Sequence, residues 1–597
     1  MEVTPATSAE DEYHPRFLDA LNEHYTVRRK NIHLLTGNVQ GLFWNAHTED
    51  FIPLEESLYR ELRENFLVVR VDIAGGLTFY DDEDTKQELV RIWNRVPKGK
   101  PIGREACRRF EKVCGESISH SLATFVLLKD IVTARREMAE DRVKPICMIF
   151  AYTGSLFPDG AFSRLSELDR QRLVFFLNWV TNPEFVKWFD LIILVNEVKS
   201  EVNAKITELP HTAHIEIQLP DVHDRKMFVT AFRARFSQQE EKRVPAQSGD
   251  KEKQIRFEGG AEQFCTDTAG LSIPALKSML ETASRTGQMI TKTNVVDAVN
   301  EIVQAQLGDI IRVKYPRHTP DDIIGYQSTQ EILAEVFQRC EDPETAVSAM
   351  IASGPNGVGK TFQLEAHAAR SGRVVIELAG IRGQYFGQTD TFFEKLRWHI
   401  DTLGKILILV DEAHTAFGSV HGTETHATER RLAGNIIKLM GDPHYHGKVL
   451  WALITSRPDQ LDPDVKSRAP VQIPIFDLED DDRERFLAEM FRRAGIAKSD
   501  EPEWQAILRL TQRYSSRDYD YYVKEISTQK RKDETRSPLD VLHRWQASRA
   551  IESHRELQML VAVLHCCYPQ LIPSHLRELD EGDIMRRVEE LKMFLRT

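Results

Sequence analysis

Apolar and polar positions follow two alternating patterns along most of the chain. Nearly continuous apolar runs, within residues 346–353, 405–414 and 449–462, are typical of strands buried in a parallel sheet. Between such runs, longer segments have apolar residues every three or four positions, which is the spacing of an amphipathic helix. The alternation of strands and helices predicts an α/β architecture with a mainly parallel sheet.

The order of these segments is repeated within the chain. Residues 68–89, VVRVDIAGGLTFYDDEDTKQEL, resemble residues 374–396, VVIELAGIRGQYFGQTDTFFEKL, with one insertion. Further on, residues 191–225 resemble residues 450–483 in the same way. A repeated series of this kind indicates two copies of one module in tandem.

One loop of the second copy carries the pattern G-x-x-x-x-G-K-T. Its residues are Gly354, Pro355, Asn356, Gly357, Val358, Gly359, Lys360 and Thr361, followed by Phe362. Glycines let consecutive backbone N–H groups curl around a phosphate, and the positive end of the next helix adds to the attraction. We expect Lys360 to reach the β- and γ-phosphates of a nucleotide and Thr361 to hold Mg²⁺. A glycine-rich turn can match the pattern by chance, but here the loop lies between a predicted strand and a predicted helix.

The predicted strand at 405–414 ends in two carboxylates, Asp411 and Glu412. Burying both would be costly unless a cation and a water molecule used them. We therefore expect Asp411 to bind the Mg²⁺ and Glu412 to polarise the attacking water as a general base. An ordinary acidic loop is the alternative. In the next strand, the hydroxyls of Thr455 and Ser456 are candidates to bond the γ-phosphate or that water.

The first copy lacks this chemistry. Where it should carry the phosphate loop, residues 32–44 read IHLLTGNVQGLFW, without the Lys-Thr pair. After the apolar run that begins at 146, Ala151, Tyr152 and Thr153 stand where the carboxylates are required. The first module is thus predicted to be degenerate and free of nucleotide, with its helical lid at 259–306 after a polar loop at 235–254.

In order along the chain, DDIIGYQSTQEILAEV, GPNGVGKT, ILILVDEA, LITSRPDQLDPDVKSR and YSSRDYDYYVKEI resemble the AAA branch of the P-loop ATPases. The resemblance is strong over residues 320–530 and weak over the first half. A degenerate first module beside an intact second one is similar to the plastid and cyanobacterial two-module AAA proteins. The resemblance implies ATP hydrolysis with Mg²⁺, a P-loop sheet with a helical lid, and assembly into a ring, expected to be a hexamer.

The resemblance also assigns roles to further residues. Ile324 and Gly325 would line the adenine site, and Ser456 would stand at the sensor position, which is usually Asn. Arg468 would be the arginine finger that reaches the nucleotide of a neighbouring subunit. Gln472 replaces the second arginine that often follows.

Residues 383–387, GQYFG, match the aromatic loop that projects into the ring pore in AAA proteins. Tyr385 and Phe386 would grip a polypeptide substrate there, although a buried aromatic pair is the alternative. The leading hypothesis is an ATP-driven remodeller of proteins, with an adaptor on the first module as a further expected partner. The other hypotheses are a nucleotide switch or scaffold that threads nothing and, less favoured, a DNA-directed motor.

Composition narrows these classes. The chain has 597 residues, 41% of them hydrophobic and 28% charged, and a net charge of −13. The acidic balance argues against a general nucleic-acid binder. No apolar run approaches the roughly 20 residues that span a bilayer, and the start lacks the features of a secretory signal, so no membrane partner and a cytoplasmic location are expected. A GTPase is not favoured because no N-K-x-D motif occurs.

The length is too great for one core, so several folding units are expected. The predicted boundaries are 1–258 for the degenerate α/β module, 259–319 for its helical lid and linker, 320–478 for the intact ATPase subdomain, 479–530 for its lid, and 531–597 for a C-terminal helical extension.

Overall fold

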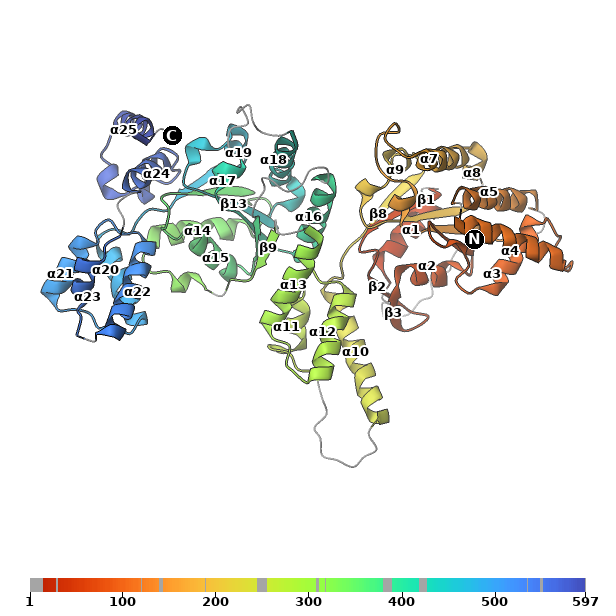
Figure 1. The fold of residues 1–597 in the computed structure, drawn as a ribbon, viewed down its shortest axis with the longest axis horizontal. Helices are drawn as coiled ribbons and strands as arrows, with labels where there is room; N and C mark the ends of the chain where they lie inside the picture. The colour runs from red at the N-terminus through yellow and green to blue at the C-terminus, as the bar shows by residue number, and fades with distance from the viewer. Residues whose placement is uncertain are drawn as a thin grey trace. The chain divides into compact units, whose positions relative to one another are not determined.

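The structure is a computed structural model that describes residues 14–595, with gaps at 28–29, 120, 139–142, 188, 244–254, 308–310, 317, 379–388, 418–426, 534 and 548–550. The chain divides into two compact units (Figure 1). The first unit holds Met1–Ala298 with Asp390–Thr402, and the second holds Val299–Thr389 with Leu403–Thr597. The division at 298/299 falls inside helix α13 (Lys292–Leu307).

A mainly parallel sheet forms the centre of the first unit, in the order β5-β4-β6-β7-β1-β8. Its strands are β1 (Ile32–Gly37), β4 (Leu67–Asp72), β5 (Gly76–Thr78), β6 (Ile146–Phe150), β7 (Leu191–Val195) and β8 (Thr212–Ile217). Strand β5 pairs antiparallel with β4, whereas the other described pairings are parallel. A small hairpin, β2 (Leu42–Asn45) and β3 (Asp50–Pro53), follows β1.

Helices connect these strands and continue beyond them. They are α1 (Arg16–Thr26), α2 (Leu54–Leu62), α3 (Glu83–Trp93), α4 (Arg104–Ser119), α5 (Ser121–Glu137), α6 (Thr153–Leu156), α7 (Glu167–Val180), α8 (Pro183–Lys187), α9 (Ala204–Thr207) and α10 (Val222–Arg243). The segment predicted as the helical lid contains α11 (Gly260–Asp267), α12 (Ile273–Thr286) and most of α13.

The second unit contains a sheet in the order β14-β10-β13-β12-β11-β9. Its strands are β9 (Ile311–Lys314), β10 (Ala349–Ser353), β11 (Val374–Leu378), β12 (Ile406–Val410), β13 (Val449–Thr455) and β14 (Val471–Pro474). Edge strand β9 pairs antiparallel with β11, and the other described pairings are parallel.

The five parallel strands of the two sheets correspond in chain order and in position: β1, β4, β6, β7 and β8 match β10, β11, β12, β13 and β14. Each sheet also has an antiparallel strand at the same edge, although β5 follows β4 in the chain whereas β9 precedes β10. This correspondence confirms the predicted α/β fold of two related modules with parallel sheets in tandem.

The apolar runs that predict strands are buried along their whole length, as every residue of β6, β12 and β13 shows. A parallel sheet covered by helices on both faces favours such continuous runs over an alternating pattern. In the second unit, α14 (Gln327–Arg339) and α15 (Lys360–Arg370) contribute to one core with the sheet. Since β10, β13 and β12 are neighbours and parallel, their carboxyl ends lie side by side.

Helices α17 (Ala413–Ala416) and α18 (Ala427–Met440) lie between β12 and β13, α19 (Pro463–Arg468) lies between β13 and β14, and α16 (Thr389–Leu403) precedes β12. The lid of this unit is formed by α20 (Asp480–Arg493), α21 (Glu501–Leu510), α22 (Ser516–Lys532) and α23 (Pro538–Arg544), which share one apolar core. Helix α23 lies in the segment predicted as the C-terminal extension. Helices α24 (Glu552–Leu564) and α25 (Glu581–Leu595) form a hairpin with a core of its own (Figure 1).

Candidate active site

The loop between β10 and α15 has the curled backbone that its glycines predict. Gly354, Gly357 and Gly359 have φ values of +131°, +91° and +85°, in the region that residues with side chains rarely adopt. A Cβ atom on Gly354 would collide with the carbonyl oxygen of Ile475, so only glycine fits there. The loop leads directly into α15, whose N-terminus begins at Lys360.

Lys360 lies inside this loop and is only 8% exposed. Its Nζ donates hydrogen bonds to the carbonyl oxygens of Gly354 and Pro355, both at 2.9 Å. Burial lowers the pKa of Lys360 to about 8, although Asp411 and Glu412 act in the opposite direction. A buried ammonium whose direct partners are neutral carbonyl groups, beside a helix N-terminus, fits an anionic phosphate.

Asp411 and Glu412 directly follow β12, as predicted, but they are exposed rather than buried. Because β12 and β10 are parallel and separated by β13 alone, both carboxylates follow β12 at the same sheet edge as the loop, and both oppose the effect of burial on the pKa of Lys360. Glu412 adopts a left-handed backbone conformation with φ +50°, and its N–H donates to Asp411 Oδ1 at 2.8 Å. The expectation of burial was wrong, because the buried strand ends at Val410 and both side chains lie beyond it, exposed at the carboxyl edge of the sheet.

A chain of polar contacts links Glu412 to the end of β13. His414 Nε2 lies 3.4 Å from Glu412 Oε2, and His414 Nδ1 lies 2.9 Å from Thr455 Oγ1. Thr455 Oγ1 also accepts a hydrogen bond from the N–H of Arg457 at 2.9 Å. Sequence reasoning missed His414, although its position two residues after Glu412 was a usable signal. The sensor residue expected from the resemblance, Ser456, is buried and directly follows Thr455.

The predicted adenine side also lies against the phosphate loop. Ile324 and Gly325 are half-buried, and Gly325 has φ +74°, where a Cβ atom would press on Leu478 in the segment that joins β14 to the lid. The hydroxyl of Tyr326 donates to the carbonyl oxygen of Val358 at 3.2 Å. Tyr326 therefore connects this segment to the loop, a contact that the motif did not reveal.

Phe362 and Thr361 begin α15 beside Lys360. The Phe362 ring is 42% exposed and stacks on His318, with centroids 4.0 Å apart and planes at 2°. Thr361 is half-buried, at the position expected of a Mg²⁺ ligand.

Two arginines from more distant parts of the second unit approach the loop. The N–H of Arg517, at the start of α22, donates to the carbonyl oxygen of Gly357 at 3.3 Å. Arg555, on α24, donates to the carbonyl oxygen of Asn356. The charges of both arginines contribute to the low pKa of Lys360, after the larger effect of burial. The loop is therefore held from outside by the backbone of Arg517 and by the side chain of Arg555.

Arg468 is exposed at the last position of α19, away from the contacts described above. Its guanidinium lies against Gly441, which follows α18, and its role at a neighbouring subunit stays a prediction. Gln472 lies on β14, paired with Ile351 of β10. Tyr385 and Phe386 fall within 379–388, outside the described residues, so their predicted role stays a prediction.

The equivalent positions of the first unit have the same backbone without the same chemistry. Gly37 is the last residue of β1 and has φ +85°, and a Cβ there would collide with the carbonyl oxygen of Ile217, as a Cβ on Gly354 would with Ile475. Ala151 and Tyr152 follow β6, and Tyr152 has φ +52°, matching Glu412. The first module thus retains the turns of the second but has neither the lysine nor the carboxylates.

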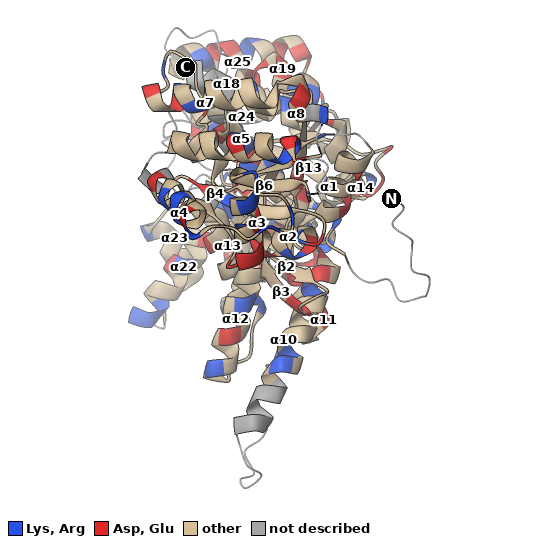
Figure 2. Cartoon of the chain, turned by 90° about the vertical axis from the view of Figure 1, so that its right-hand side faces the viewer, with Lys and Arg blue, Asp and Glu red and all other residues tan. Residues whose placement is uncertain are grey.

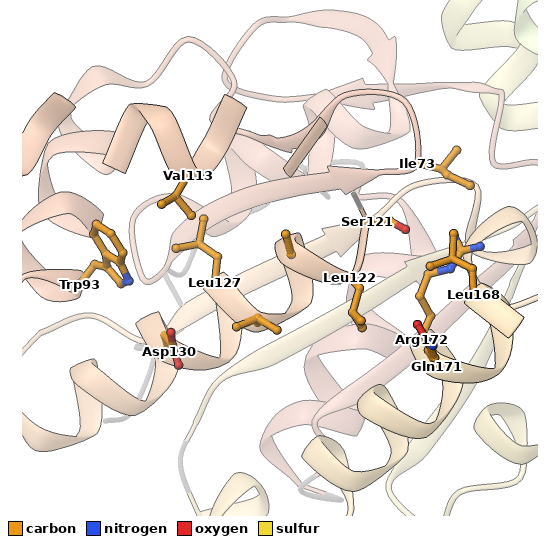
Figure 3. Close-up of a pocket in the computed structure, with 12 residues that line it drawn as sticks. Ile73, Trp93, Val113, Ser121, Leu122, Leu127, Asp130, Leu168, Gln171 and Arg172 are labelled. Atoms are coloured by element: carbon orange, nitrogen blue, oxygen red, sulfur yellow. The ribbon is translucent and has the colours of Figure 1, made fainter. Parts of the chain in front are cut away.

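The first unit has an apolar cavity of about 700 Å³ instead (Figure 3). Its lining comes mainly from α5 and α7, with Leu122, Leu127 and Leu168 on the walls and Asp130 and Arg172 among its polar members. Every lining residue belongs to the first unit, whereas the phosphate loop belongs to the second. Within the part of the chain that the structure describes, no helix has the length and apolar character to cross a bilayer.

Both halves of the chain match known families. Residues 5–218 match the family described as AAA+ chaperone, N-terminal Rossmann-like domain, and residues 350–476 match the ATPase family associated with various cellular activities, AAA. Protein SAV of Sulfolobus acidocaldarius is 22% identical over 297 residues. That match covers 46% of this chain and 37% of the relative, so the chain corresponds to well under half of that protein.

Proposed function

The chain belongs to the AAA family of P-loop ATPases, and on that premise we propose that its second module hydrolyses ATP to remodel protein substrates within a ring of identical subunits. The observation that carries the proposal is the convergence of the curled loop, Lys360 and the two carboxylates after β12 at one edge of a parallel sheet. This constellation is the one that phosphoryl transfer from ATP needs.

Each residue then has a role. The loop amides and Lys360 bind the phosphates, and the segment with Ile324 and Gly325 lines the adenine side. Glu412 accepts a proton from the attacking water, and its exposed position gives water access to the carboxylate. His414 and Thr455 hold the carboxylate in place through the contacts at 3.4 Å and 2.9 Å.

The residues also fit Mg²⁺. Among the described residues, no three His, Cys, Asp or Glu side chains cluster into a separate metal site. Mg²⁺ at nucleotide sites is usually held by one or two side chains and the phosphates themselves, so Thr361 and Asp411 suffice. When bound, the ion neutralises charge on the β- and γ-phosphates.

Ring assembly and work on polypeptides are supported by the exposure of Arg468, by the aromatic loop at 383–387 and by the family of the first module. A nucleotide switch without threading would share the same ATP site. A DNA-directed motor is less favoured, since acidic and basic side chains are mixed along helices such as α4 and α12 (Figure 2) and the net charge is −13. Stimulation of turnover by DNA would favour the motor instead.

Replacing Tyr385 with Ala separates the remodeller from the switch. Tyr385 lies 24 residues after Thr361, too far along the chain to bind phosphate in the same loop. We expect ATP turnover within a few-fold of wild type. Remodelling of a substrate should fall at least tenfold, because the same substrate contact is lost in every subunit of the ring. Turnover and unfolding of a tagged model protein measure the two effects.

The control is Tyr521→Ala, which removes a tyrosine that is 58% exposed on the lid helix α22. It should change neither property. If Tyr385 is instead a core residue, its truncation should cost about 3 kcal/mol or more of stability and lower the melting temperature. A destabilised and inactive Tyr385→Ala protein would refute the pore assignment.

His414→Ala should lower ATP turnover by about tenfold while nucleotide affinity stays near wild type, because the residue positions Glu412 rather than the phosphates. Thr455→Val should produce a loss of similar size, and Thr455→Ser, which keeps the hydroxyl, should retain most activity. Steady-state turnover beside nucleotide titration provides the comparison. Full activity in both His414→Ala and Thr455→Val would show that the contacts between Glu412, His414 and Thr455 do not contribute to catalysis.

A further inference from the structure

Helix α24 of the C-terminal hairpin holds one residue of the phosphate loop by both its backbone groups. The N–H of Asn356 donates to Gln558 Oε1 at 3.1 Å, and the carbonyl oxygen of Asn356 accepts from Arg555. Arg555 and Gln558 are three residues apart and so lie on one face of the helix. The outer turn of the loop is therefore fixed by a segment two hundred residues away in sequence.

Arg555 also binds a second element of the site. Its Nη2 donates to both oxygens of Asp477, at 2.7 and 2.5 Å. Asp477 lies between β14 and α20, in the segment that joins the sheet to the lid. The Arg555 side chain is 14% exposed, and a charge-assisted contact with a carboxylate in such a setting is among the stronger polar interactions. One guanidinium thus joins the phosphate loop to the connection with the lid.

Further contacts fix the hairpin to the rest of the second unit. Its core includes Phe476, the neighbour of Asp477, packed with Leu557 and Leu560 of α24. On its other side, Lys592 of α25 lies 3.6 Å from Asp459, which follows the end of β13. A movement of the loop or of the lid connection would therefore act on the hairpin as a whole.

We propose that Arg555 is a positioning residue that couples nucleotide binding to docking of the α24–α25 hairpin. The inference rests on the proposed ATP site. A nucleotide that orders the loop strengthens the contacts of Asn356 with α24, and by reciprocity a docked hairpin raises affinity for nucleotide. The proximity of the arginine to Lys360 adds positive charge to the same site, in line with its effect on the lysine pKa.

The first test is nucleotide affinity, measured with a fluorescent ATP analogue on the full chain. Arg555→Ala should raise the Kd about tenfold, since it removes charge-assisted contacts to two elements. Arg555→Lys should recover little, because one ammonium nitrogen cannot replace the two guanidinium nitrogens that contact Asp477 and the Asn356 carbonyl separately. Gln558→Ala should have a smaller effect. The matched control is Arg587→Ala, which breaks an exposed pair with Glu556 in the same hairpin and should leave the Kd unchanged.

The second readout is hydrogen–deuterium exchange in α24 and α25 with and without the analogue. Wild type and Arg587→Ala should exchange more slowly there when nucleotide is bound, and Arg555→Ala should not respond. Thermal unfolding identifies variants that fail to fold. If Arg555→Ala fails to fold, Gln558→Ala carries the test, and an unchanged Kd with a normal exchange response would overturn the inference.

The outcomes separate this inference from the proposed function. A wild-type chain that binds no ATP analogue contradicts the ATP site itself. A wild-type chain that binds it, together with an Arg555→Ala chain of equal affinity and equal exchange response, leaves the site intact and contradicts the coupling alone.

Discussion

Replacing Glu412 with glutamine is expected to reduce ATP turnover by about a hundredfold or more while leaving ATP bound. Glutamine has nearly the shape of glutamate but cannot accept the proton of the attacking water. The loop, Lys360 and Asp411 remain, so the phosphates and Mg²⁺ keep their binding partners. The measurement is retention of radiolabelled ATP on the purified chain beside steady-state turnover.

Lys360→Ala is the complementary variant. Removing the buried ammonium takes away the charge that the loop encloses, so binding itself should be lost. The matched control is Tyr152→Gln in the first module, at the position equivalent to Glu412, where turnover should stay at the wild-type level. Normal turnover in the Glu412→Gln chain would contradict the assignment of the base, and a loss in Tyr152→Gln would contradict a first module without catalysis.

The second large effect is expected at Arg468. If its guanidinium stabilises the transition state at a neighbouring subunit, Arg468→Ala should lower turnover by about a thousandfold with little change in nucleotide affinity. Turnover per subunit of the wild-type chain should also rise with protein concentration as subunits assemble. Arg509→Ala, at another exposed arginine of the second unit, serves as the control and should be fully active.

Mixing the two inactive chains tests whether Arg468 acts between subunits. Arg468→Ala and Glu412→Gln fail in different roles, so some interfaces in a mixed ring combine an intact site with an intact arginine. Partial recovery of turnover on mixing is the expected result. Turnover that does not depend on concentration and does not change in Arg468→Ala would exclude this role.

The sequence predicted the elements of the site that come from short, continuous segments. The glycine positions of the phosphate loop and the carboxylates after β12 were identified because local backbone geometry and local spacing define them. The degenerate first module was predicted for the same reason, and the matching turns at Gly37 and Tyr152 confirm the relation between modules. The strand register pairs Val71 with Phe150 and Leu378 with Val410, so Val71 corresponds to Leu378 in the structure. This alignment of the two modules differs by one residue from the alignment of their sequences.

The contacts that no motif encodes were missed. Tyr326, Arg517 and Arg555 reach the loop from three separate segments, and their approach depends on how the lid and the hairpin pack. The burial expected of Asp411 and Glu412 was wrong because a strand pattern shows where a run ends but not which way the chain then turns. His414 could have been found from its spacing to Glu412, whereas its partner Thr455 required the order of strands in the sheet.

The most direct test of the central claim is electron cryomicroscopy of the Glu412→Gln chain with ATP and Mg²⁺. We predict a closed ring with nucleotide at residues 354–361 of each second module, Arg468 of a neighbour beside the γ-phosphate, and no nucleotide in the first module. Single subunits that hold ATP without a ring, or nucleotide density in the first modules, would contradict it.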